Sequence, residues 1–311
     1  MRKTIFALLT ALGVWACSPA EDSGREAGEP LKVVCTTGMI ADALQQIVGD
    51  SAEVESLMGP GVDPHLYKAT QGDLKLLRSA DVVFYNGLHL EGKMGAVLDK
   101  LGRLKPVVAL ADSLPPARLM NSTDYAGAYD PHVWFDVSLW SEVVAIASQN
   151  MARLDAENAT YYRSNTAAFQ KELAALHEEV KQKISEIPEA QRVLITAHDA
   201  FAYFGRAYDI QVRGLQGIST LSEYGLKDVS QLVDFITQRQ IRAVFVESSV
   251  PTKALEAVVE GCAQRGHEVR IGGTLYSDAM GAAGTPAGTY TGMVRENVAV
   301  VLEGLGNRKM H

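Results

Sequence analysis

Short apolar runs alternate with amphipathic segments along the first third of the chain. The runs at 31–37 (LKVVCTT), 52–58 (AEVESLM), 81–87 (DVVFYNG) and 105–112 (KPVVALAD) predict strands. The segments between them, 38–50, 72–80 and 93–103, carry apolar residues at helical spacing. Strands that alternate with helices predict a parallel sheet covered on both faces.

The same pattern returns in the last third. A strand at 192–197 (RVLITA) is followed by a helical segment at 198–209, and the runs 241–248 (IRAVFVES) and 267–273 (HEVRIGG) predict further strands. The likeness between the two halves is loose, but both have the same order of elements. We therefore expect an α/β protein with two Rossmann-like lobes built on parallel sheets.

A long helical pattern separates the two halves. Residues 158–187 contain neither Gly nor Pro, and their apolar positions form one stripe. Asn158 is expected to cap the helix and Pro188 to end it. Thirty helical residues are about 45 Å long. This predicts one rigid helix, 158–187, between an N-terminal lobe at 31–157 and a C-terminal lobe at 188–311.

The N-terminus has the pattern of an export signal. A basic start precedes an apolar run from Ile5 to Trp15, too short to span a bilayer. Residues 14–17 (VWAC) resemble a lipobox, which predicts a signal peptide at 1–16 and a lipid anchor on Cys17. Residues 17–30 are polar and read as a flexible tether. We expect an exported protein, periplasmic or at the cell surface, held to the membrane by this anchor.

Charge and cysteine content narrow the choice of partners. The formal net charge is −8, which argues against nucleic acid and against a basic face for membranes. The length and the 47% hydrophobic content are ample for a core. Of the three cysteines, Cys35 and Cys262 lie in opposite halves, and we expect two buried thiols rather than a disulfide.

Four residues are candidate metal ligands. The tripeptide Asp-Pro-His occurs twice, ending at His65 and His132, and proline holds each histidine in a stiff extended or turn segment. His198 directly follows a predicted strand, at the expected first turn of a helix, and Asp278 follows the strand 267–273. His65 also follows a strand. Open α/β sheets bind ligands at such strand ends, so these residues predict a cleft between the lobes.

Three imidazoles and one carboxylate suit zinc, manganese or ferrous iron. A ligand histidine must be neutral, and the expected helix N-terminus would keep His198 unprotonated. Taken singly, each of these residues also fits a plain turn, cap or packing role. Glu247 either orients a ligand histidine or is a strand-end carboxylate facing water.

The other histidines have weaker patterns. His89, with Glu91, follows the third strand and is the reserve ligand candidate. His177 is expected on the solvated face of the linking helix, His267 in a turn and His311 in the tail.

Six segments together carry a family resemblance: GVDPHLYKAT, YDPHVWFD, LITAHDAFAYFGRAYDI, GLQGISTLSE, VFVESSVP and IGGTLYSDAMG. They resemble the zinc- and manganese-binding solute-binding proteins of ABC transporters, the TroA-like group, from about Leu31 to the C-terminus. The resemblance implies two α/β lobes, a rigid linking helix and a metal held by His65, His132, His198 and Asp278. It also implies a membrane permease as partner, and we expect a monomer.

The resemblance does not decide the metal. Members of the manganese branch typically have glutamate as the third ligand. This chain has His198 at that position, and zinc binders have histidine there too. Zinc binders often carry a long His- and acid-rich loop before the second ligand, and the segment before His132 is short. We expect Zn²⁺ or Mn²⁺ as transported cargo, with Fe²⁺ as a further possibility.

Three other functions fit parts of the pattern. A zinc hydrolase usually keeps three protein ligands and an open water position, and no HExxH motif or nucleophile elbow is present. A metal-stabilised surface adhesin fits the tether and export. Chelated iron would need a wide cleft without four converging side chains. We expect a capture protein and no enzyme.

Overall fold

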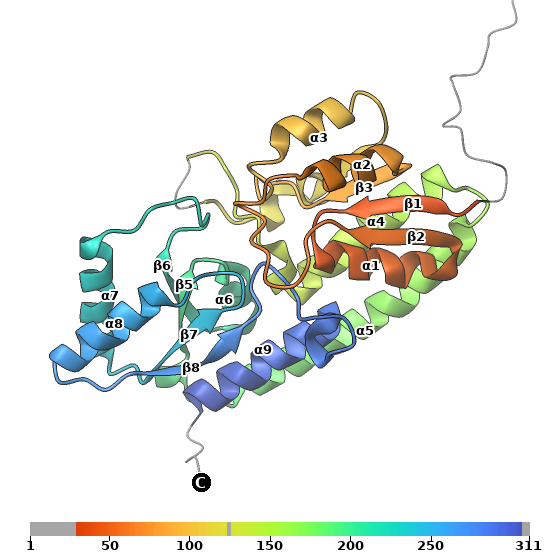
Figure 1. Ribbon diagram of the computed structural model, residues 1–311. Coiled ribbons are helices and arrows are strands. Elements are labelled where there is room, and N and C mark those ends of the chain that lie inside the picture. The colour runs from red at the N-terminus through yellow and green to blue at the C-terminus, as the bar shows by residue number, and fades with distance from the viewer. Residues whose placement is uncertain (1–28, 123–125, 307–311) are drawn as a thin grey trace, which may run out of the picture.

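The computed structural model describes residues 29–122 and 126–306. The predicted signal peptide, Cys17, nearly all of the tether and His311 lie outside these ranges. Two separate sheets lie on either side of the molecule, and long helices run along both (Figure 1). Each sheet has four strands, and every pairing is parallel. The α/β class with two parallel-sheet lobes is therefore confirmed.

The N-terminal lobe holds the first sheet, in the order β2-β1-β3-β4. Its strands are β1 (Leu31–Cys35), β2 (Ala52–Ser56), β3 (Val82–Tyr85) and β4 (Val107–Ala109). Its helices are α1 (Gly38–Val48), α2 (Gln71–Ser79), α3 (Gly95–Leu101) and α4 (Val137–Leu154). All the strands and helices expected in 31–112 are present, and each deviates by only a few residues at its ends.

The C-terminal lobe holds the second sheet, in the order β6-β5-β7-β8. Its strands are β5 (Val193–His198), β6 (Gln211–Gln216), β7 (Ala243–Glu247) and β8 (Arg270–Leu275). Its helices are α6 (Ala202–Tyr208), α7 (Leu226–Arg239), α8 (Lys253–Gln264) and α9 (Tyr290–Leu305). The edge strand β6 was not predicted, because most of its side chains are exposed or half-buried and it has no continuous apolar run.

Alternate strand residues pack into different cores, as the two-residue period of a strand requires. In β1, Val33 and Cys35 face the large core, whereas Val34 faces a smaller one with α2 and α3. In β7, Phe245 faces the large core and Val244 packs with α7 and α8. The large core therefore takes one face of each sheet and continues from one lobe into the other.

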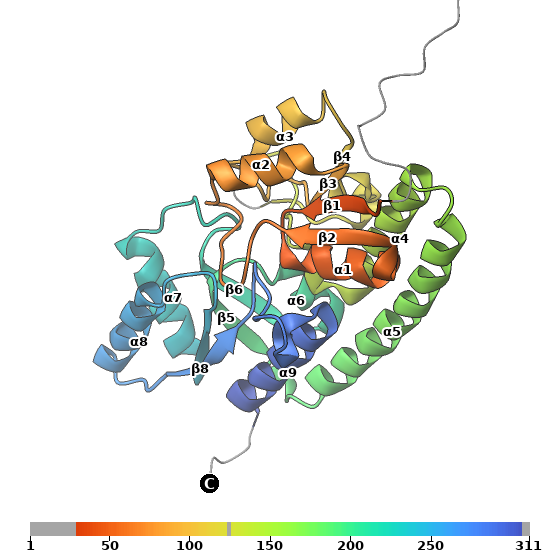
Figure 2. The ribbon, with the colours of Figure 1, turned by 45° about the vertical axis from the view of Figure 1, so that its right-hand side comes forward.

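Two helices, α5 (Ala159–Ser185) and α9, run between the lobes (Figures 1 and 2). The N-terminal part of α5 lies against α1 and α4, and its later part lies against α6 and α9. Helix α9 also contacts α1 and β8, which makes it a second brace beside α5. Asn158 is the residue before α5, but its side chain bonds Asp155 instead of capping the helix, and α5 ends before Pro188.

Both predicted thiols are buried and free. Burial raises the pKa of the Cys35 thiol, which keeps it protonated and unreactive at neutral pH. None of the helices among the described residues is long and apolar enough to cross a membrane.

Candidate metal centre

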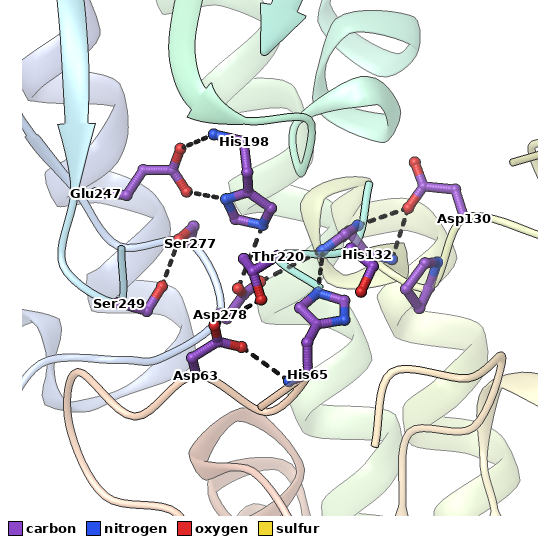
Figure 3. Close-up of polar contacts among 12 residues, drawn as sticks. Asp63, His65, Asp130, His132, His198, Thr220, Glu247, Ser249, Ser277 and Asp278 are labelled. Atoms are coloured by element: carbon purple, nitrogen blue, oxygen red, sulfur yellow. Dashed lines mark hydrogen bonds and ion pairs between the residues drawn. The ribbon is translucent and has the colours of Figure 1, made fainter. Parts of the chain in front are cut away.

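Four side chains converge between the two sheets: His65, His132, His198 and Asp278. Each offers one nitrogen or oxygen atom, and these atoms all lie within 4.8 Å of one another. All four residues are 1% exposed or less. Figure 3 shows them pointing toward a common centre from different segments of the chain. The four residues singled out from the sequence thus meet in one place.

Strand ends bring these residues together. His65 lies in the loop between β2 and α2, and His132 lies in the loop before α4. His198 is the last residue of β5, and Asp278 follows the end of β8 by three residues. The carboxyl ends of the parallel strands in each sheet point to the same side, where α/β proteins place their ligands.

The expected position of His198 at a helix N-terminus was wrong. His198 ends strand β5, and α6 begins only at Ala202. The chain stays extended because the backbone of His198 pairs with Gln216 of β6. A helix dipole therefore does not set the protonation of His198, and the carboxylates around it do.

His198 is held by a buried glutamate at the end of β7. One carboxylate oxygen of Glu247 accepts the backbone N–H of His198 at 2.8 Å, and the other lies 2.5 Å from its Nδ1. Glu247 is 2% exposed, so the alternative of a carboxylate facing water is wrong. With Nδ1 facing the carboxylate, Nε2 points at the centre, 3.2 Å from Asp278 Oδ2.

Asp130 holds both the backbone and the ring of His132 through a single carboxylate oxygen. Asp130 Oδ1 accepts the backbone N–H of His132 at 2.9 Å and lies 2.7 Å from its Nδ1. Nε2 of His132 then faces the centre, 3.3 Å from Nε2 of His65 and 3.4 Å from Oδ1 of Asp278. The first Asp-Pro-His has the same turn, with the backbone N–H of His65 donated to Asp63 at 2.8 Å.

Burial and neighbouring charges shift the pKa values of the four residues at the centre. Burial alone lowers the pKa of a histidine, and it brings that of His65 to about 3. For His132, the carboxylates of Asp130 and Asp278 outweigh burial and raise the pKa to about 9. For His198, Glu247 and Asp278 likewise outweigh burial and raise the pKa well above its usual value. The same two histidines lower the pKa of Asp278 although burial raises it. The ionised Asp278 carboxylate therefore balances their positive charge.

The carboxylate of Asp278 has no hydrogen-bond donor of good geometry among the described residues. Its two oxygens lie 3.2 and 3.4 Å from histidine nitrogens, but those contacts do not have hydrogen-bond directions. A buried carboxylate without donors is costly unless a cation neutralises it, and here that cation is either the protonated His132 and His198 or a metal ion that displaces their protons. The donor set of three imidazoles and a carboxylate suits a divalent transition metal.

The reserve candidates lie outside this cluster. His89 is exposed and has a φ of 66°, in the left-handed region. The carboxylate of Glu91 is buried and accepts hydrogen bonds from Thr36 Oγ1 and from the backbone N–H groups of Asn86 and Gly87. Glu91 thus fixes the turn after β3 instead of offering a free ligand atom.

Two other histidines differ from the sequence-based expectation. His177 on α5 is half-buried, with its Nδ1 3.2 Å from the hydroxyl of Tyr208 on α6, so it is not a solvated surface residue. His267 follows a turn, as expected, but its ring is buried and Nε2 donates to the carbonyl of Ile241 at 2.6 Å. Neither ring contributes to the centre.

Hydrogen bonds that the sequence did not predict tie the His132 loop to the C-terminal lobe. The Trp134 ring donates to the carbonyl of Ser277 at 3.0 Å, beside Asp278. Tyr203 of α6 donates to the carbonyl of Asp130 at 3.0 Å, and Tyr290 of α9 donates to that of Trp134 at 2.7 Å. No local pattern signals these contacts, because each pair lies at least 73 residues apart in the chain.

Comparison with known proteins places the chain among metal-binding proteins. A family model described as zinc-uptake complex component A, periplasmic, matches residues 33–304. The manganese-binding lipoprotein MntA of Bacillus subtilis is 48% identical over 98% of this chain and all of its own length. The zinc-binding protein TroA of Treponema pallidum is 44% identical, over 98% of this chain and 99% of its own.

A solved structure shows the same fold. The periplasmic zinc-binding protein TroA from Treponema pallidum superimposes with a TM-score of 0.86 at 47% identity. The match covers 89% of this chain and 99% of that one. The chain therefore belongs to the family of zinc-uptake complex component A, the periplasmic metal-binding proteins that include TroA and MntA.

Proposed function

We propose that this protein captures a divalent transition metal, Zn²⁺ or Mn²⁺, between its two lobes and delivers it to an ABC permease. The observation that carries the proposal is the buried convergence of three imidazole nitrogens and one carboxylate from both lobes. The metal is cargo, and the proposed ligands are His65, His132, His198 and Asp278.

The distances between the ligand atoms fit a metal ion. Bonds of about 2.0–2.1 Å to a tetrahedral ion place neighbouring ligand atoms about 3.4 Å apart. The contacts at the centre are 3.3 Å between the two Nε2 atoms of His65 and His132, and 3.4 and 3.2 Å from Asp278 to His132 and His198. Each of these separations has the length that a small divalent ion requires, and the two contacts of Asp278 are made by different oxygens, Oδ1 to His132 and Oδ2 to His198.

The donor set supports both metals. Three neutral imidazoles and one carboxylate satisfy Zn²⁺ completely, and the second oxygen of Asp278 adds a fifth donor for a metal with a higher coordination number. At equal free concentration, Zn²⁺ binds nitrogen and oxygen sites more tightly than Mn²⁺. Relatives named for each metal match nearly the whole chain, in keeping with a site that accepts either.

Export and delivery complete the proposal. The relatives include lipoproteins named as substrate-binding proteins of metal ABC transporters. The lipobox at 14–17 supports an anchor on Cys17 outside the cytoplasmic membrane. The four protein ligands leave less room for the open water position of catalytic zinc sites, which supports transport over hydrolysis.

Metal uptake by living cells tests this function. We expect deletion of the gene from its source organism to reduce uptake of radioactive zinc or manganese at low external metal, and the intact gene to restore it. A copy with His198→Ala should fail to restore uptake although the protein is exported at the normal level. Equal uptake with and without the gene, for both metals, would refute the transport role.

A further inference from the structure

The two Asp-Pro-His motifs form the same turn, but their aspartates do different things. Asp130 uses one oxygen for both the backbone and the ring of His132. Asp63 binds the backbone N–H of His65 through Oδ1, and its Oδ2 accepts a hydrogen bond from the hydroxyl of Thr220 at 2.6 Å. Thr220 belongs to the other lobe, 157 residues along the chain. Figure 3 shows its contact with Asp63.

The ligand loops also differ in how they are held. The His132 loop is tied to the C-terminal lobe by the buried bonds of Trp134, Tyr203 and Tyr290. The loop of residues 59–70, which we call the His65 arm, lies between β2 and α2 and approaches the C-terminal lobe at its tip. A Cβ atom on Gly61 would lie 3.3 Å from the carbonyl of Ser248. Among the described residues, the arm's hydrogen bond to that lobe is the one from Thr220 to Asp63.

The partner loop of the arm is itself fixed to the ligand strands. Thr220 lies in the loop between β6 and α7, and the side-chain amide of Gln216 donates to the carbonyls of Thr220 and Ser222 at 2.7 and 2.6 Å. Gln216 ends β6 and pairs with His198, the last residue of β5. A continuous set of contacts therefore runs from His198 through Gln216, Thr220 and Asp63 to His65.

The arm also lines an open pocket that reaches the centre. Gly59, Pro60 and Val62 of the arm form part of the wall of this pocket of about 350 Å³, and Asp278 and Met280 line it too. Movement of the arm away from the C-terminal lobe would widen this pocket and withdraw His65 from the other three ligands.

From these observations we infer that Asp63 and Thr220 form a latch that holds the His65 arm closed over the metal. Asp63 is a positioning residue: it fixes the turn of His65 with one oxygen and anchors that turn to the C-terminal lobe with the other. His132, His198 and Asp278 stay assembled when the latch opens, and His65 is the ligand that leaves. The inference rests on the proposed metal-binding function and adds the route by which the metal is retained and released.

The test measures the rate at which the purified protein loses its metal. The protein is loaded with Zn²⁺ and mixed rapidly with an excess of a coloured chelator. A hydrogen bond to a charged group that is partly exposed is worth enough to change a rate roughly tenfold. Thr220→Val, which removes the donor and keeps the shape, is therefore expected to release Zn²⁺ roughly tenfold faster than the wild type. Thr220→Ser, which keeps the hydroxyl, is expected to release it at the wild-type rate.

Two controls separate the latch from loss of structure. Ser219→Ala removes a neighbouring hydroxyl that accepts the N–H of Leu221 within the same loop, and it should leave the release rate unchanged. The visible spectrum of bound Co²⁺ should be the same in Thr220→Val and in the wild type, because the ligand set is intact. In the double variant Asp63→Ala/Thr220→Val, release should be no faster than in Asp63→Ala alone, since Asp63→Ala already removes the contact with Thr220, in addition to its bond to the N–H of His65.

The possible results distinguish this inference from the proposed function. A wild-type protein that binds no metal would overturn both. A wild type that binds Zn²⁺ with Thr220→Val releasing it at the same rate, or with Ser219→Ala accelerating release as much, would overturn the latch alone. Failure of Thr220→Ser to restore slow release would also contradict it.

Discussion

Glu247 offers a sharp test of how the centre is organised, because a single buried carboxylate holds both the backbone and the ring of His198. Replacement by glutamine keeps the size of the side chain and removes one of its two acceptors. The amide can turn its NH₂ group either toward the backbone N–H or toward Nδ1 of His198. The first orientation leaves a buried N–H without an acceptor, which costs about 1–3 kcal/mol.

The second orientation has a similar cost for a different reason. An amide NH₂ that faces Nδ1 requires that nitrogen to accept, so the ring proton moves to Nε2. That tautomer blocks the nitrogen aimed at Asp278 and at the metal. Substitution of the group that orients a ligand histidine typically weakens metal binding about 10–100-fold. We expect a loss of this size for Glu247→Gln, with one equivalent of metal still bound at saturation.

Competition with a chelator of known affinity measures this change for Zn²⁺ and Mn²⁺. Glu55→Gln, at an exposed carboxylate on β2, is the control and should bind as the wild type does. The thermal midpoint of the metal-free variant shows whether the fold is intact. An unchanged dissociation constant in a folded Glu247→Gln protein would refute the reasoning that this carboxylate sets the tautomer of His198.

Three further outcomes are expected. Metal affinity should rise with pH from 6.5 to 9, because nearby carboxylates raise the pKa of both His132 and His198, and the metal must displace the protons that these rings hold. A flat profile from chelator competition over this range would contradict this. Trp134→Ala should lower the free energy of unfolding of the metal-free protein by about 3–5 kcal/mol, because the loss of a side chain that is 1% exposed leaves a cavity and the Ser277 carbonyl loses its donor. Denaturant unfolding measures this, and a loss under about 1 kcal/mol would mean that the loop does not need this anchor. Removal of metal by a chelator should leave the far-ultraviolet circular dichroism unchanged and lower the melting temperature, because free metal at a hundred times its dissociation constant adds about 2.7 kcal/mol to the free energy of unfolding. Unfolding on chelation would instead make the metal a structural element and not cargo.

The strand pattern could be predicted wherever strands are buried on both faces. Runs such as RVLITA are mostly apolar because helices cover both sides of the sheet, and β5 lies there as expected. The edge strand β6 lacks this signal, since solvent reaches most of its residues. The missing strand also explains the error at His198, whose extended backbone depends on pairing with Gln216.

The proposed ligands could be singled out because short motifs and strand ends place them. The residues around them could not, except for Glu247. Asp63 and Asp130 occupy the same place in the same tripeptide. Asp130 bonds the ring of His132 two residues away, whereas Asp63 bonds Thr220, 157 residues along the chain, and nothing in the tripeptide itself signals this difference. His177 looks solvated in the helical pattern of 158–187, and only the packing of α6 against α5 half-buries it.

Elemental analysis of the purified protein tests the central claim most directly. The protein is produced in medium with equal zinc, manganese and iron, beside His198→Ala and Asp278→Ala variants. We expect about one equivalent of divalent metal in the wild type, following the single cluster of four ligands in the described part of the chain, and its loss in both variants. A wild type without stoichiometric metal, or variants that keep it, would contradict the assignment of this centre.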